Sequence, residues 1–156
     1  MLNELCTECR NYFLRDYTNP SNCIHEGTYT IKDGMIQALP FLRAGQYYRI
    51  VGSALNDGVH KYGGTWQQYD PPAAMLDETF TGCIWEMCIP QDVIKLASDI
   101  KQWVLDNAEA INSPYQSETT PVYSYTKAIA NTGRLSTDWR QHFEGRLKPY
   151  RRVREI

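Results

Sequence analysis

The hydrophobic pattern of this chain changes period twice, and that change constrains its fold more than any other feature. Between Thr28 and Tyr62 apolar and polar residues alternate, and two turn sequences, Asp33-Gly34 and Asp57-Gly58, interrupt the alternation. On both sides of this region apolar residues recur every three or four positions, as they do in amphipathic helices. The pattern therefore predicts an α+β fold, in which helices flank a small antiparallel sheet or barrel.

Helical spacing predicts an N-terminal helix over Leu2–Asp16 and a long central helix over Gln91–Ala110, and we expect these two helices to pack on each other. Ser136-Thr137-Asp138 offers an N-cap for a short C-terminal helix. Pro149 would end that helix, so that Tyr150–Ile156 leaves the body as an extended arm.

The alternating region predicts five short antiparallel strands, arranged as two hairpins plus one further strand. We expect them over Thr28–Lys32, Met35–Leu39, Gln46–Val51, Val59–Tyr62 and Thr79–Met87. Residues 63–74 and 113–125 follow neither period and are interpreted as loop or extended segments. We therefore expect one domain over 1–148, with 22–88 as a β-rich insertion between helices, and a C-terminal arm over 149–156.

Charge is distributed unevenly along the chain. The formal net charge is −2, but residues 140–156 contain six basic and two acidic residues, which leaves −6 on the rest. A basic tail of this kind is typical of an interaction arm or of a solvated end. The acidic body argues against general nucleic-acid binding, so we expect it to bind duplex DNA weakly at physiological salt.

The sequence contains no apolar run long enough to span a membrane, and charged residues in the first fifteen positions argue against a signal peptide. Five cysteines are therefore expected to be reduced thiols in a cytosol-type compartment. Cys6 and Cys9 form a C-x-x-C pair, which leaves open a small binding module with a zinc site. Because both lie on the apolar stripe of the first predicted helix, we interpret them as core residues and expect no metal.

No nucleophile, phosphate-binding loop or metalloprotease motif is present, so we expect no enzymatic activity and no cofactor. A nuclease-like site built on His60 and nearby acids is a remote alternative. Asn56-Asp57-Gly58 is better explained by turn chemistry. The tyrosines lack an interleaved basic cluster and are better explained by packing than by base stacking.

Several segments, in this order, resemble head–tail connector proteins (head-completion or adaptor proteins) of long-tailed phages and prophages. The longest are LCTECRNYF at 5–13, LPFLRAGQYYRIVGS at 39–53 and DETFTGCIW at 77–85. Shorter ones are NDGV at 56–59, Pro90, SPYQSE at 113–118 and YSYTK at 123–127. Together they span roughly Leu2 to Lys127.

The resemblance implies a structural virion protein at the head–tail interface, present in the host cytoplasm during assembly. Such proteins form a ring of about twelve subunits beneath the portal, extend the DNA channel without sequence-specific DNA binding, and meet a downstream connector or tail protein. The expected partners are thus the portal protein, further copies of this chain and the next tail component.

Under this interpretation the basic C-terminal residues are candidates for docking on the portal or on an adjacent subunit, because exposed guanidinium groups need carboxylate partners. These residues are Arg146, Lys148, Tyr150, Arg151, Arg152 and Arg154. Aromatic residues of the loops are candidates for contacts with other subunits or with the tail: Trp66, Tyr69, Tyr115, Tyr123 and Tyr125.

Overall fold

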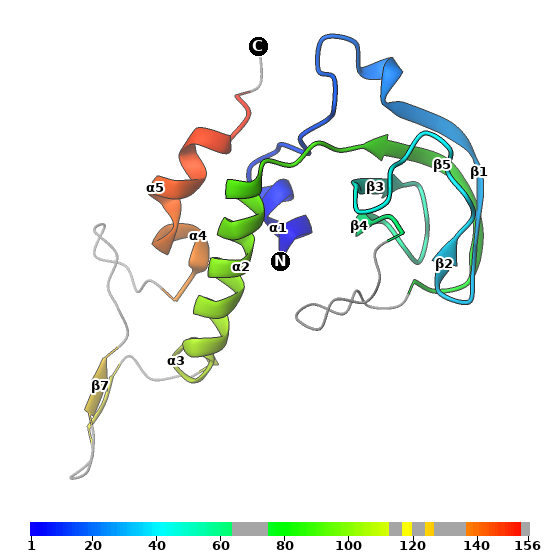
Figure 1. Ribbon diagram of the computed structural model, residues 1–156. Coiled ribbons are helices and arrows are strands. Elements are labelled where there is room, and N and C mark those ends of the chain that lie inside the picture. The colour runs from blue at the N-terminus through cyan, green and yellow to red at the C-terminus, as the bar shows by residue number, and fades with distance from the viewer. Residues whose placement is uncertain (64–74, 113–116, 120–123, 127–136, 154–156) are drawn as a thin grey trace. The chain divides into compact units, whose positions relative to one another are not determined.

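The computed structural model describes residues 1–63, 75–112, 117–119, 124–126 and 137–153. They belong to two compact units (Figure 1), a helical unit made of Met1–Asn11 with Gln91–Ile156 and a sheet unit made of Tyr12–Pro90. The β-rich insertion that the sequence predicted over 22–88 lies within the sheet unit. The predicted α+β fold is confirmed, with helices and a five-stranded antiparallel sheet.

The helical unit is built around α2 (Gln91–Asp106), which begins directly after Pro90 as predicted. The predicted central helix continues as a separate short helix, α3. The other elements of this unit are α1 (Leu2–Glu8), α3 (Ala108–Asn112), α4 (Trp139–His142), α5 (Glu144–Leu147), a 3₁₀ turn η2 (Lys148–Tyr150), and the antiparallel pair β6 (Ser117–Thr119) and β7 (Ser124–Thr126).

Both α1 and α4 pack against α2. Buried residues come from all three helices, and on α2 they are Val93, Leu96, Ala97 and Ile100. On the α4 side, Trp103 stacks on His142 with ring centroids 4.8 Å apart, and Phe143 meets Trp103 edge-on. The predicted packing of the first helix on the central helix is thus confirmed. None of the helices in the described part of the chain has the length and apolar character needed to cross a bilayer.

The first helix ends at Glu8, earlier than the predicted Asp16. Its end is a Schellman motif, because the Arg10 amide donates to Thr7 O and the Asn11 amide donates to Cys6 O. Arg10 occupies the left-handed position with a φ of 50°, where glycine is the usual residue. The apolar spacing continues through Tyr12 and Phe13, which belong to the sheet unit. The sequence pattern therefore predicted too long a helix.

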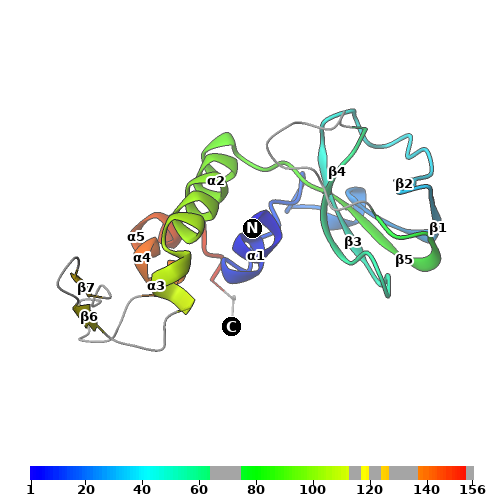
Figure 2. The ribbon, with the colours of Figure 1, turned by 90° about the horizontal axis from the view of Figure 1, so that it is seen from below.

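The sheet unit contains five antiparallel strands in the order β2-β1-β5-β3-β4. In Figure 2, β5 lies between β1 and β3. The strands are β1 (Ile24–Lys32), β2 (Met35–Ile36), β3 (Tyr47–Val51), β4 (Gly58–Lys61) and β5 (Glu78–Glu86). All five predicted strands are present, although β2 is shorter and β1 longer than expected.

A turn sequence and a glycine within a strand explain two features of this sheet. Asp33 and Gly34 both have positive φ, 54° and 76°, as a type I′ hairpin requires, so the predicted hairpin is confirmed. A Cβ at Gly82 would collide with the carbonyl oxygen of Val51, so only glycine permits β5 to approach β3 this closely.

Alternation sets the two faces of the sheet. In β3, Tyr48 and Ile50 are buried, whereas Tyr47, Arg49 and Val51 point to the opposite, outer face. The buried face joins one hydrophobic core made of Tyr29, Ile31, Leu39, Leu42, Tyr48, Ile50, Phe80 and Ile84. Fully burying side chains of this kind contributes about 1.5–3 kcal/mol each, which makes this core the main stabilising element of the unit.

The C-terminal segment differs from its prediction. Asp138 is the N-cap, as expected, and its side chain accepts a hydrogen bond from the Arg140 amide. The helix is broken into α4, α5 and η2, and Pro149 lies inside η2. The prediction that Tyr150 and the next residues leave the body is wrong for Arg151 and Arg152, because both bind other parts of the helical unit.

Candidate functional site

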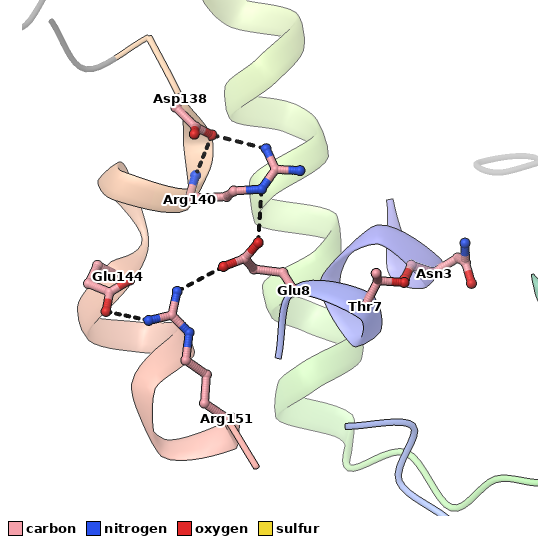
Figure 3. Close-up of polar contacts among 7 residues, drawn as sticks. All are labelled: Asn3, Thr7, Glu8, Asp138, Arg140, Glu144 and Arg151. Carbon is pink, nitrogen blue, oxygen red and sulfur yellow. Dashed lines mark hydrogen bonds and ion pairs between the residues drawn. The ribbon is translucent and has the colours of Figure 1, made fainter. Parts of the chain in front are cut away.

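A group of five charged side chains joins α1 to the C-terminal segment of the helical unit. We call it the charge cluster: Glu8, Asp138, Arg140, Glu144 and Arg151. Figure 3 shows the Glu8 carboxylate between the two guanidinium groups. Its Oε2 accepts a hydrogen bond from Arg140 Nε at 3.0 Å, and its Oε1 accepts one from Arg151 Nη2 at 2.9 Å.

The two arginines each bind a second carboxylate. Arg140 Nη1 lies 3.2 Å from Asp138 Oδ1, and Arg151 Nη1 lies 2.6 Å from Glu144 Oε1. The guanidinium groups therefore link three separate elements: α1, the start of α4 and the start of α5. Isolated surface pairs contribute only about 0.2–1 kcal/mol, but a network that shares one carboxylate holds its members in a defined geometry.

Two hydrogen bonds to the backbone add to these ion pairs. Asn11 Nδ2 donates to Tyr150 O at 3.0 Å, and the Arg152 amide donates to Cys9 O at 2.9 Å. The Cys9 carbonyl is at the C-terminal end of α1, where carbonyl groups lack partners within the helix. The C-terminal segment thus completes the end of the first helix.

Charge complementarity keeps the two arginines ionised. Burial by itself would lower the pKa of Arg140, but the hydrogen bonds and charges of Asp138 and Glu8 outweigh it and raise that pKa. For Arg151, too, burial lowers the pKa, and Glu144 and Glu8 raise it overall. The two guanidinium groups are therefore fixed positive charges and not proton donors near neutral pH.

The predicted docking residues fall into two groups. Arg146 binds Asp99 with an Nη2–Oδ2 distance of 2.8 Å, and Arg151 belongs to the charge cluster. The side chains of Lys148 and Arg152 are exposed, and Tyr150 is partly buried. Arg154 lies outside the described residues, as do Trp66, Tyr69, Tyr115 and Tyr123. Tyr125 is on β7, but its side chain is not described.

The C-x-x-C pair has the surroundings of core residues. Cys6 and Cys9 are both buried, and burial raises the pKa of the Cys9 thiol, so that the thiolate needed by zinc is disfavoured. The described part of the chain contains no group of three or more His, Cys, Asp or Glu side chains arranged to hold a metal ion.

A second polar cluster lies in the sheet unit and orders the loop between β3 and β4. Glu78 accepts hydrogen bonds from the Ser53 hydroxyl, from the Ala54 amide and from Asn56 Nδ2. The Asn56 side chain also pairs with the backbone of Leu76, accepting at 2.8 Å and donating at 2.9 Å. The hydrogen bonds to Glu78 lower its pKa, and the bond from Ser53 has the largest effect.

His60, on β4, makes its hydrogen bond to the backbone of this loop. Its Nε2 lies 2.7 Å from Asn56 O, and burial lowers its pKa, although Asn56 O and Asp57 oppose that shift. Ser53 instead donates to Glu78, so the serine and the histidine have different partners. The polar side chains of this region are used to order the loop.

A third charged site lies at the end of β5. The Glu86 carboxylate lies 2.8 Å from Arg15 Nε and 2.7 Å from His25 Nε2, and its side chain is only 5% exposed. The Arg15 amide also donates to Glu86 O. These contacts connect the segment before β1 to β5, the central strand of the sheet.

Sequence reasoning missed the partners in all three sites. Glu8 lies within the predicted N-terminal helix, and its partners lie 132 and 143 positions further on. No local pattern identifies such pairs. No family model, curated protein or solved structure matches this chain.

Proposed function

We propose that this chain is a structural head–tail connector of a long-tailed phage or prophage, without catalytic activity. It would form a ring between the portal and the next connector or tail protein, and the ring would extend the DNA channel. The virion location follows from this role.

The observation that carries the proposal is the placement of two of the three longest segments that resemble connector proteins. Residues 39–53 contain β3, and residues 77–85 make up nearly all of β5. These strands are neighbours in the sheet, with Arg49 directly opposite Trp85. Segments far apart in the sequence thus combine into one structural element, which favours a shared fold over a set of unrelated short matches.

The charge cluster supports a docking role for the C-terminal segment. Together with the hydrogen bond from the Arg152 amide to Cys9 O, it holds Arg151 and Arg152 at the end of α1. A segment that is already ordered loses less conformational entropy when it binds a partner. In this proposal Lys148, Arg152 and Arg154 contact the portal or an adjacent subunit, and Arg151 and Arg146 position them. The loop residues Trp66, Tyr69, Tyr115, Tyr123 and Tyr125 would contact neighbours or the tail.

The test is assembly with the portal protein of the genome that encodes this chain. We expect native mass spectrometry and negative-stain images to show a ring of about twelve copies attached to the portal. A monomer that does not bind the portal would contradict the proposal. If that monomer carried stoichiometric zinc, the binding-module alternative would be favoured.

The docking residues need variants that leave the charge cluster intact. Charge reversal at Arg151 would also break its contacts with Glu8 and Glu144, so it is a poor probe of docking. We expect Lys148→Glu with Arg152→Glu to prevent attachment to the portal. Lys95→Glu, on an exposed position of α2, is the matched control and should leave attachment unchanged. Equal attachment by all variants would exclude the docking role.

A further inference from the structure

Two basic side chains on the outer face of the sheet unit lack a carboxylate partner among the described residues. They are Arg49 on β3 and Lys61 on β4, and each contacts aromatic rings instead. We call the group Tyr12, Tyr47, Arg49, Lys61 and Trp85 the cation–aromatic patch. Its side chains are partly buried, except for Lys61, which is exposed.

Arg49 is held between two aromatic rings. Its Cζ lies 3.7 Å from the centroid of the Tyr12 ring and 4.6 Å from that of Trp85. The two rings contact each other edge-on, with an interplanar angle of 88°. The strand register places Arg49 directly opposite Trp85. The guanidinium group is therefore fixed by contacts with ring faces, which leave its N–H groups available for an acceptor in its plane.

Lys61 extends this surface along the neighbouring strand. It is paired in register with Tyr47, and its Nζ lies 5.8 Å from the centroid of the Tyr47 ring. Tyr47 and Arg49 are on the same face of β3, because both alternate with the buried Tyr48. The two cations thus lie on one face of adjacent strands.

Four other arginines of this chain differ from Arg49 in having a carboxylate partner. Arg15, Arg140, Arg146 and Arg151 each have a guanidinium nitrogen within 3.2 Å of a carboxylate oxygen. Arg49 is partly withdrawn from water and has no such partner in the described part of the chain. A planar carboxylate that accepts two N–H groups is the acceptor that best matches its geometry.

We propose that the cation–aromatic patch binds an acidic peptide segment of a partner protein, with a carboxylate on Arg49 and a second one near Lys61. An acidic peptide fits better than nucleic acid. Two separated cations match single carboxylates, whereas a polyphosphate chain needs a longer row of basic residues to neutralise it, and residues 12–90 contain only five basic residues against eight acidic ones. This inference does not depend on the proposed connector function.

The test uses the full chain with two probes, a short oligo-glutamate peptide and an oligothymidylate of equal charge. NMR shifts of the Trp85 indole N–H and the Arg49 Nε–H report binding at the patch. We expect the peptide to shift both signals. Arg49→Ala should weaken its binding at least about tenfold, because a charge-assisted hydrogen bond is lost.

Matched variants separate binding from folding. Arg49→Lys keeps the charge but loses the planar fork, so it should also weaken binding while the sheet remains folded. Arg43→Ala removes an exposed arginine of the same unit and should have no effect. Unshifted Trp85 and Arg49 signals, or equal affinity in Arg49→Ala, would overturn the proposal. Tighter binding of the oligothymidylate would overturn it in favour of a nucleic-acid surface.

Discussion

Glu8 in the helical unit and Glu86 in the sheet unit each bridge two basic side chains, but they differ in exposure. The Glu8 side chain is 26% exposed, and its partners Arg140 and Arg151 are 46% and 35% exposed. The Glu86 side chain is 5% exposed. The partners of Glu86 are also partly exposed, Arg15 by 50% and His25 by 29%, so the two bridges differ in the burial of the shared carboxylate, which water screens at Glu8 and reaches far less at Glu86.

The comparison teaches that similar ionic geometry serves different purposes in the two units. Around Glu86 the bridge is part of the folded sheet, because removing the charge leaves a buried position without its partners. Around Glu8 the bridge contributes little to the free energy of folding, but it fixes the position of the C-terminal segment on the surface of the helical unit. Three of the following predictions test this distinction, and one concerns His60 in the sheet unit.

The largest effect is expected for Glu86→Gln. A neutral amide cannot form the two charge-assisted contacts with Arg15 and His25, and hydrogen bonds to charged groups contribute about 2 kcal/mol. We expect the free energy of unfolding of the sheet unit to fall by about this amount, measured by urea unfolding with hydrogen exchange of the β5 amides.

Glu26→Gln is the matched control for this variant, because Glu26 is an exposed glutamate on β1. It should change the free energy of unfolding by less than about 0.5 kcal/mol. Equal effects of the two substitutions would show that burial does not distinguish these carboxylates.

Acidification tests a partly buried histidine of the sheet unit. Burial lowers the folded pKa of His60 from 6.5, against the opposing effects of Asn56 O and Asp57. Below pH 6.5 His60 is protonated in the unfolded chain but stays neutral in the folded chain. The contribution of His60 to the free energy of unfolding is therefore fully present above pH 6.5 and decreases as the pH falls towards the lowered pKa. The loss is less than about 1.4 kcal/mol per pH unit.

The measurement is urea unfolding of the sheet unit at several pH values, for the wild type and for His60→Gln. Glutamine retains a donor for Asn56 O but does not titrate, so the difference between the two curves isolates His60. Parallel curves across this pH range would contradict the prediction.

Local patterns were sufficient to predict most elements. Asp33-Gly34 identified the hairpin between β1 and β2, because few other dipeptides accept positive φ at both positions. Pro90 and the apolar spacing after it identified α2. In both cases the determining interactions lie within a few residues of each other.

The rest could not be predicted, because it depends on contacts between distant residues. Arg10 ends α1 in a left-handed conformation that sequence alone assigns to glycine. The Asn56 side chain pairs with the Leu76 backbone, twenty positions away. The charge cluster joins α1 to residues more than 130 positions later. The basic tail was therefore expected to need an external carboxylate, whereas Glu8 and Glu144 supply one internally for Arg151.

A smaller effect is expected for Glu8→Gln. The substitution weakens both bridges to the C-terminal segment, each of which contributes at most about 1 kcal/mol. We expect faster hydrogen exchange of the Arg152 amide, which donates to Cys9 O, with little change in the global free energy of unfolding. Glu4→Gln on the same helix is the control, because Glu4 is 58% exposed and contacts only the N-terminal amine among the ion pairs described.

The smallest effect is the salt dependence of the same amide. Raising the ionic strength from about 0.1 M to about 1 M shortens the screening length from about 10 Å to about 3 Å. The half-exposed bridges of Glu8 should then lose about 0.5 kcal/mol, so that Arg152 exchanges about twofold faster. The Met87 amide, which donates to Tyr47 O beside Glu86, should exchange at an unchanged rate. Glu8→Gln should reduce the salt effect at Arg152, since both Glu8 bridges are lost and only the Arg140–Asp138 and Arg151–Glu144 pairs remain to be screened. A salt response at Met87 as large as at Arg152 would mean that the Glu86 bridge is as accessible to ions as the Glu8 bridge, and the distinction between the two carboxylates would fail.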